Sequence, residues 1–271
     1  MKNKFRFLGI AALVVVMVFT FVSCGGSGGN YAMVRVPGGS FQMGDTNGGG
    51  SDNEKPVHTV TLNSFSIGKY EVTQVLYESV MGNNPSLFSG GNLPVEQVTW
   101  YDAIEFCNRL SEKEGLHPVY TIGDLTVTAD WNKNGYRLPT EAQWEYAAKG
   151  GNKSLGNYMY SGSDNADEVA WYGDNSGSST HTVGTKKPNG LGIYDMSGNV
   201  WEWCWDSYED YPNEAQTNPA STSSGFFRVL RGGGWGDTAG NVRSSTRSGS
   251  GWSDGYPSTG PGDLGFRLVR P

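Results

Sequence analysis

The last forty residues constrain the fold most, because two ordered stretches enclose a segment that cannot fold by itself. The first stretch is Arg231-Gly232-Gly233-Gly234-Trp235, and the second is Leu264-Gly265-Phe266-Arg267. Between them lie the 28 residues 236–263, of which nineteen are Gly, Ser, Thr or Asp. So few apolar residues bury too little surface for independent folding. We therefore expect a rigid frame that pins a polar segment at both ends.

The polar segment 236–263 fits two interpretations. Small polar residues with a few aromatic anchors are typical of antigen-binding loops, but they are also common in ordinary surface loops. Arg243 and Arg247 are predicted to hold the loop, because a guanidinium can donate to several carbonyls. For ligand contact the sequence offers ten candidates, in which Trp and Tyr supply contact area and small residues supply hydrogen bonds: Gly236, Asp237, Thr238, Gly240, Thr246, Ser248, Trp252, Ser253, Asp254 and Tyr256.

Residues 1–23 are predicted to be a targeting segment. Basic residues at 2–6 precede an apolar stretch over 8–22 that is short for a membrane span. A small residue before Cys24 resembles a bacterial lipoprotein signal and implies lipidation of Cys24, although Phe21 departs from the usual Leu. An uncleaved anchor and plain secretion are the alternatives. The expected location is the bacterial cell envelope, at the exposed face of the outer membrane.

The remaining chain is acidic. The formal net charge of −7 becomes −10 once the three basic residues of the targeting segment are removed. This charge argues against a nucleic-acid partner, which needs a basic surface. Cys107 and Cys204 could pair in an exported protein, but their apolar surroundings favour buried free thiols equally.

Local patterns predict several short elements. We expect two short strands in 31–44 about a Pro37-Gly38-Gly39 turn, a strand pair in 57–67 and a strand over 94–100. A second strand pair is expected in 116–135. The expected helices are 74–81 (Thr73 cap, Gly82 stop), one after a Thr99–Asp102 capping box that ends before Gly115, and 141–148 after a Thr140–Gln143 capping box.

These patterns indicate a single α+β domain over 31–271 that is irregular and Gly-rich and has few short helices. After Gly151 no further helix is expected. Residues 24–30 would form the lipidated Cys and a flexible Gly/Ser tether. The domain is expected to be a monomer.

Several long segments together resemble one family, that of the formylglycine-generating enzymes (sulfatase-modifying factors). They include Arg137-Leu138-Pro139-Thr140-Glu141-Ala142, Gly190-Leu191-Gly192-Ile193-Tyr194-Asp195-Met196-Ser197-Gly198-Asn199-Val200-Trp201-Glu202-Trp203, Arg231-Gly232-Gly233 and Leu264-Gly265-Phe266-Arg267. The resemblance spans 31–271 in collinear order. It implies an irregular variant of the C-type-lectin fold.

The resemblance also implies an oxidase that binds copper through two cysteines between the last two motifs. Aligned on Arg231-Gly232-Gly233, the two cysteine positions are Asp237 and Val242. Cu(I) prefers soft thiolate ligands, which neither residue supplies. The histidines at 58, 117 and 181 have no metal-ligand spacing. We therefore expect no copper and no catalytic residue.

A loop of the same family binds calcium, and the matching residues here are Asp195, Gly198, Val200 and Glu202. The resemblance implies side-chain oxygens from the first and last, and backbone carbonyls from the other two. Two carboxylates at that spacing suit a hard cation. The alternative is that Glu202 hydrogen-bonds loop amides and no metal binds.

A narrower resemblance is to the variable proteins of diversity-generating retroelements, which share this fold. Their hypervariable C-terminal stretch lies inside the same Arg-Gly-Gly-x-Trp and Gly-Phe-Arg frame, and adenine substitution of Asn codons yields Gly, Ser, Thr, Asp and Tyr there. The lipoprotein signal is similar to that of spirochaetal (treponemal) variable lipoproteins. The function implied is recognition of a protein or glycan ligand by segment 236–263. The alternatives are an oxidase with changed chemistry and a structural envelope lipoprotein.

Overall fold

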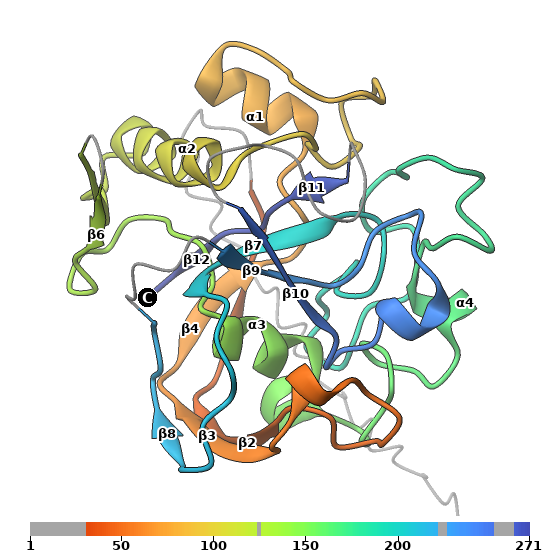
Figure 1. Cartoon of the computed structure of the whole chain (residues 1–271). Helices are drawn as coiled ribbons and strands as arrows, with labels where there is room; N and C mark the ends of the chain where they lie inside the picture. Colours follow the sequence, from red (N-terminus) through yellow and green to blue (C-terminus); the bar gives the residue numbers. More distant parts are fainter. Residues whose placement is uncertain (1–30, 124–125, 222–226, 252–262) are drawn as a thin grey trace, which may run out of the picture.

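The computed structural model describes residues 31–123, 126–221, 227–251 and 263–271. Helices α1 (Gln74–Met81) and α2 (Trp100–Lys113) cover one end of the molecule, and β2 (Gly39–Met43), β3 (His58–Leu62) and β8 (Gln216–Thr217) form the other (Figure 1). Within these ranges no helix is both long and apolar enough to traverse a bilayer. The expected irregular α+β architecture is confirmed, because short helices and small sheets are joined by long connections.

The first four strands pair in an order that the sequence did not predict. β1 (Met33–Val36) pairs with β4 (Phe65–Gly68), and β2 pairs with β3, both antiparallel. The two strands expected about the turn at 37–39 are therefore confirmed. The pairing expected within 57–67 is wrong, although both of its strands exist. The two connections cross closely, since a Cβ at Gly38 would lie 2.5 Å from the carbonyl oxygen of Leu62. Each strand thus joins the sheet in which its alternating apolar side chains are buried.

The helix predictions are confirmed because their signals are local. Thr99 and Thr140 both form reciprocal capping boxes, with Asp102 and Gln143, at the starts of α2 and α3 (Glu141–Ala148). Gly82 ends α1 with a left-handed φ of 83°, although the Thr73 side chain makes no capping hydrogen bond. One expectation fails nearby: residues 94–100 form no strand.

A central four-stranded sheet carries the C-terminal frame. Its order is β10 (Arg247–Gly251), β9 (Phe227–Arg231), β7 (Trp201–Ser207) and β11 (Leu264–Gly265). Every residue of β7 is buried. β12 (Val269–Arg270) joins β4 instead, so the last motif connects two sheets. The antiparallel pair β5 (Tyr120–Ile122) and β6 (Val127–Ala129) confirms the pair expected in 116–135.

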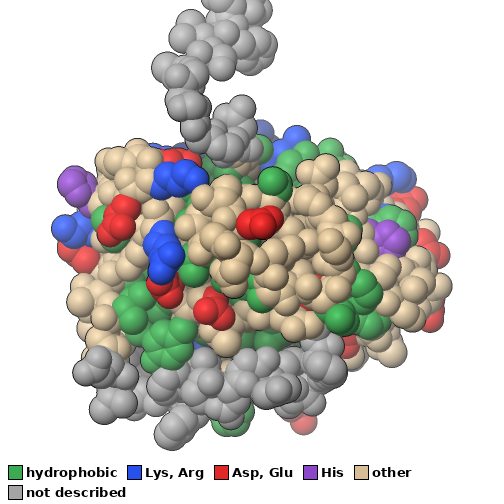
Figure 2. Space-filling view, turned by 90° about the horizontal axis from the view of Figure 1, so that it is seen from above, with side chains coloured by type: hydrophobic (Ala, Val, Ile, Leu, Met, Phe, Trp, Pro, Cys, Tyr) green, Lys and Arg blue, Asp and Glu red, His purple; other side chains and the backbone are tan. Residues whose placement is uncertain are grey.

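No helix was expected after Gly151, but the described residues there contain one short α-helix besides two single 3-10 turns. α4 (Ala166–Val169) is one turn that packs with Tyr172 and Val242 in a small apolar cluster. Cys107 and Cys204 are buried free thiols in two different core clusters, so the disulfide alternative is excluded. From above, most of the described surface is backbone or side chains that are neither hydrophobic nor charged (Figure 2).

Candidate functional site

Two consecutive glycines connect the end of β9 to the candidate ligand-binding surface. Gly232 and Gly233 have φ values of 95° and 74°, in the left-handed region. A Cβ at Gly233 would lie 2.7 Å from the carbonyl oxygen of Asn241. A side chain would therefore add a clash to the backbone strain. This close approach sets where the segment leaves the sheet.

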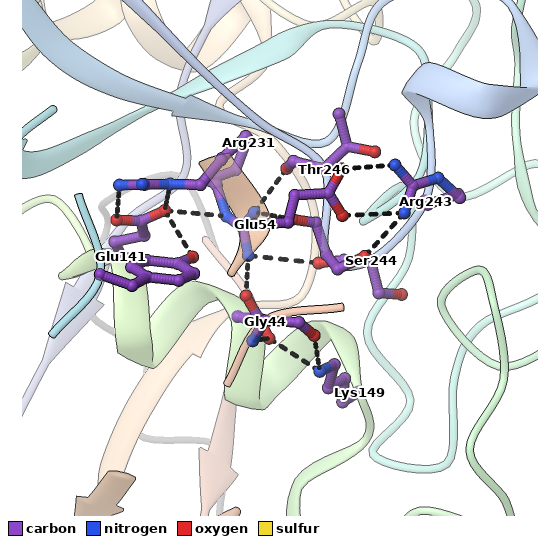
Figure 3. A network of polar contacts seen from close by, with 12 residues as sticks. Gly44, Glu54, Glu141, Lys149, Arg231, Arg243, Ser244 and Thr246 are labelled. Carbon is purple, nitrogen blue, oxygen red and sulfur yellow. Dashed lines mark hydrogen bonds and ion pairs between the residues drawn. The ribbon is translucent and has the colours of Figure 1, made fainter. Parts of the chain in front are cut away.

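Four buried arginine–glutamate pairs hold the C-terminal segment to the rest of the domain. Figure 3 shows part of this network around Arg231 and Arg243. Buried ions must be paired and hydrogen-bonded, so each pair restricts how the segment can move. We call these four the arginine clamps: Arg231–Glu145, Arg243–Glu54, Arg247–Glu141 and Arg267–Glu202.

Arg231 is the centre of the clamps and is completely buried. Its Nη1 donates to the carbonyl of Ser245 at 2.7 Å, and Nη2 donates to the Glu145 carboxylate and to the carbonyl of Ser244 at 3.2 Å. Burial opposes the charged form, but Tyr211 and the neighbouring glutamates keep the pKa of Arg231 above its usual value. One side chain thus fixes the backbone of the predicted variable segment.

Arg243 and Arg247 confirm the predicted scaffold role. Arg243 Nε donates to the Gly240 carbonyl at 2.8 Å, while its Nη1 binds Glu54 Oε2 at 2.8 Å. Arg247 binds both carboxylate oxygens of Glu141, at 2.7 and 2.8 Å. Burial alone would raise the pKa of Glu141, but Arg247 and then Arg231 lower it. Residues 242–247 are consequently all buried.

In the described part of the segment the exposed positions all lie within residues 236–241, which we call the exposed strip. Gly236, Thr238 and Gly240 are exposed, and the last three residues form a single 3-10 turn, Ala239–Asn241. The Thr238 hydroxyl makes no hydrogen bond within the described part of the chain. These side-chain positions are therefore available to a partner without loss of an internal contact.

Two predicted contact residues are corrected by their positions. Thr246 is only 7% exposed, and its hydroxyl donates to the Gly240 carbonyl at 3.2 Å. The Asp237 carboxylate accepts hydrogen bonds from Trp201 Nε1 at 2.7 Å and from the Gly234 amide at 2.8 Å. Both side chains hold the loop instead of facing a ligand.

The other predicted contacts divide between β10 and the undescribed part of the segment. Ser248 is half-buried on β10, where it pairs with Leu230 of β9. Trp252, Ser253, Asp254 and Tyr256 lie outside the described residues. Their contact roles remain predictions.

The residues at the two family copper positions cannot bind copper as thiolates would. Val242 is completely buried against α4, and the Asp237 carboxylate is occupied by Trp201 and Gly234. Burial raises the pKa of the Cys107 and Cys204 thiols, and both lie in the core. A thiol kept protonated in apolar surroundings is a poor nucleophile and a poor metal ligand.

The residues of the predicted calcium loop do not fit a calcium ion. Glu202 Oε2 accepts from Arg267 Nε at 2.6 Å and from Trp144 Nε1 at 2.7 Å, while Arg267 Nη2 binds Oε1 at 2.5 Å. The alternative of Glu202 binding loop amides does not hold either. Asp195 Oδ2 accepts from the Gly184 amide, and its Oδ1 has no hydrogen-bond partner among the described residues. No group of three or more Asp, Glu, His or Cys side chains in the described part of the chain is placed to hold a metal. The cation beside Glu202 is a guanidinium.

The acidic partners of the four arginines were not predicted from the sequence. Glu54, Glu141, Glu145 and Glu202 lie 65 to 189 positions from their arginines, beyond any local pattern. One signal was available: α3 carries Glu141 and Glu145 one turn apart among apolar residues. Charged residues on an otherwise buried helix indicate buried partners. Asp263 was also missed; burial and then Asp237 raise its pKa to about 7.

The chain is similar to known proteins in both sequence and structure. The model of the sulfatase-modifying factor enzyme 1-like domain matches residues 26–271. The solved structure of Treponema denticola variable protein 1 superposes with a TM-score of 0.79 at 39% identity, covering 88% of this chain and 95% of that chain.

Two relatives extend the comparison. A protein of Paenibacillus barcinonensis named chaperone protein LppX is 42% identical over an alignment that covers 95% of this chain and 97% of that protein. The formylglycine-generating enzyme of Streptomyces coelicolor is 31% identical, with 88% of each chain covered. The chain therefore belongs to the sulfatase-modifying factor (formylglycine-generating enzyme) family.

Proposed function

We propose that this chain is a lipid-anchored ligand-binding protein of the bacterial envelope, displayed at the outer surface. Its C-terminal segment 236–263 recognises a protein or glycan, and it performs no oxidation. The likeness to a treponemal variable protein, and to a relative named as a chaperone and not as an oxidase, supports this role. The retroelement-diversified origin of the segment belongs to the same proposal.

The observation that carries the proposal is the separation between clamped and exposed positions. The arginine clamps use residues 231, 243, 247 and 267, and the exposed strip 236–241 lies between the first two. Substitution at Thr238 would break no hydrogen bond of the described structure. A surface that varies without loss of stability needs this division, since most destabilising changes occur at buried or bonded positions.

The family's oxidase activity is disfavoured by the residues at the reaction centre. Asp237 and Val242 occupy the cysteine positions, and both are committed to holding the loop. We expect no tight stoichiometric Cu(I) binding in a titration of the purified chain. Stoichiometric tight binding would revive the oxidase alternative.

A matched pair of variants tests the binding surface. The purified chain is screened on glycan arrays and on intact cells, and the affinity of each ligand found is then measured. Thr238→Trp adds bulk on the exposed strip, and we expect it to weaken binding at least tenfold, about 1.4 kcal/mol. Thr121→Trp places the same bulk on the exposed face of β5 and should leave binding unchanged. Equal affinities for both variants would refute a ligand site at the strip.

The proposed diversification has a separate test in the DNA. A near-copy of the 3′ end that differs at adenines, beside a reverse transcriptase gene, is expected next to the coding sequence. Its absence would leave a non-diversified lipoprotein with the same binding face.

A further inference from the structure

A concave site lies away from the exposed strip, between β3, α3 and the connection that follows β7. Its volume is about 400 Å³, within the range of small-ligand pockets. Its walls include His58, Glu141, Asp206, Asp210 and Arg247. The family's reaction centre, at residues 237 and 242, does not contribute to it.

The charges that line this pocket leave a negative excess. Arg247 is neutralised by its two contacts to Glu141, and no lysine is among the described lining residues. No other arginine or lysine of the described lining neutralises Asp206, Glu209 or Asp210. Outside the lining, Arg228 and Arg137 interact electrostatically with Asp206, so the excess negative charge rests mainly on Glu209 and Asp210. Glu209 and Asp210 are exposed at the rim, where they can attract a ligand of positive charge.

His58 supplies an independent observation. It is 4% exposed, and its Nδ1 lies 3.1 Å from the carbonyl oxygen of Pro56. A carbonyl oxygen only accepts, so Nδ1 carries a proton, and in that neutral tautomer Nε2 is an acceptor. Nε2 is buried and has no hydrogen-bond partner among the described residues. A buried acceptor without a partner costs about 1–3 kcal/mol, which a donor from a ligand would recover.

Asp206 forms part of the pocket wall, where two backbone amides hold its carboxylate. Its two carboxylate oxygens accept from the backbone amides of Glu141 and Ser221, at 2.7 and 2.9 Å. Burial raises the pKa of Asp206 to about 7, even though these amides oppose the shift. A cation in the pocket would favour the ionised form of this carboxyl.

We propose that this pocket binds a primary alkylammonium group, which donates one N–H to His58 Nε2 and is attracted by Asp206, Glu209 and Asp210. An ammonium fits because it combines positive charge with three donors. The group can belong to a free diamine or to a lysine side chain of another protein.

The test uses the full chain and three probes in calorimetric titrations at low salt. The probes are 1,5-diaminopentane, Nα-acetyl-lysine methylamide and tetramethylammonium, which has the charge but no N–H donor. We expect at least one primary amine to bind at least tenfold more tightly than tetramethylammonium. Binding of the diamine alone identifies a free amine as the ligand, and binding of the lysine derivative indicates a protein side chain. Failure of both primary amines, or equal binding of tetramethylammonium, overturns the proposal.

Variants then locate the binding. Asp210→Asn removes one exposed charge from the rim and should weaken amine binding at least threefold. Asp174→Asn removes the same charge from an exposed residue outside the pocket and should have no effect. His58→Phe should abolish the preference for a primary over a quaternary amine. If His58→Phe does not fold, the ¹⁵N resonance of His58 Nε2 must shift on addition of the amine. An unchanged resonance, or equal effects of the two aspartate variants, refutes the site.

Discussion

Arg231 offers the sharpest test of how the C-terminal segment is held. Arg231→Met keeps a long side chain but removes the charge, and it leaves the carboxylate of Glu145 buried without its guanidinium. Loss of one partner of a buried ion pair costs roughly 3–5 kcal/mol. The carbonyls of Ser244, Ser245 and Thr246 also lose their donor. Lys149 Nζ, 2.8 Å from Glu145 Oε1, offsets part of this loss.

The expected net destabilisation is about 4 kcal/mol, a large part of the 5–15 kcal/mol typical of a folded domain. For a chain of this size it corresponds to a fall in Tm of roughly 8–16 °C. Urea unfolding followed by tryptophan fluorescence, with a thermal melt by circular dichroism, measures both quantities. Arg231→Lys keeps the charge but loses the forked geometry, so an intermediate loss is expected.

Arg109→Met is the matched control. Arg109 forms an ion pair with Glu105 one helical turn away, and both side chains are about half exposed. Such pairs contribute only about 0.3–0.5 kcal/mol. If Arg231→Met costs no more than Arg109→Met, the clamps do not hold the segment, and the argument for a rigid frame fails.

Three further outcomes are expected. Since burial raises the pKa of Asp206 and Asp263 to about 7, the folded state holds more protons than the unfolded state between about pH 4 and 7. The free energy of unfolding should therefore fall as pH rises from about 4 to 7, and Asp263→Asn should lessen that fall in urea titrations; an unchanged slope would contradict this assignment. Gly233→Ala should destabilise by about 2–4 kcal/mol, because its Cβ meets the Asn241 carbonyl, whereas Gly177→Ala, with a φ of 62° and open space, should cost about 1–2 kcal/mol. A chelator should leave Tm unchanged, since a guanidinium already neutralises the carboxylate of the expected calcium loop; a clear fall in Tm would restore that site.

At the candidate surface, some features could be predicted from local sequence patterns and others could not. The frame formed by Arg231-Gly232-Gly233 and Leu264-Gly265-Phe266-Arg267 was evident in the residue pattern, and so was the holding role of Arg243 and Arg247. The burial of Thr246 was not, because it depends on two tertiary contacts: Arg231 donates to the Thr246 carbonyl, and the Thr246 hydroxyl donates to the Gly240 carbonyl that also accepts from Arg243. Composition identifies a polar loop, but it does not indicate which residues of that loop face the protein.

Helices α1, α2 and α3 were predictable because capping and apolar periodicity act within one or two turns of the chain. The pairing of β1 with β4, and of Arg231 with Glu145 86 residues away, depended on tertiary structure alone. Strand edges accept many partners, and a buried charge accepts any opposite charge that packing brings within reach. The amino-acid order thus determined the local elements and the polar character of segment 236–263. Packing of distant side chains decided which strands join and which of the described residues of that segment are exposed.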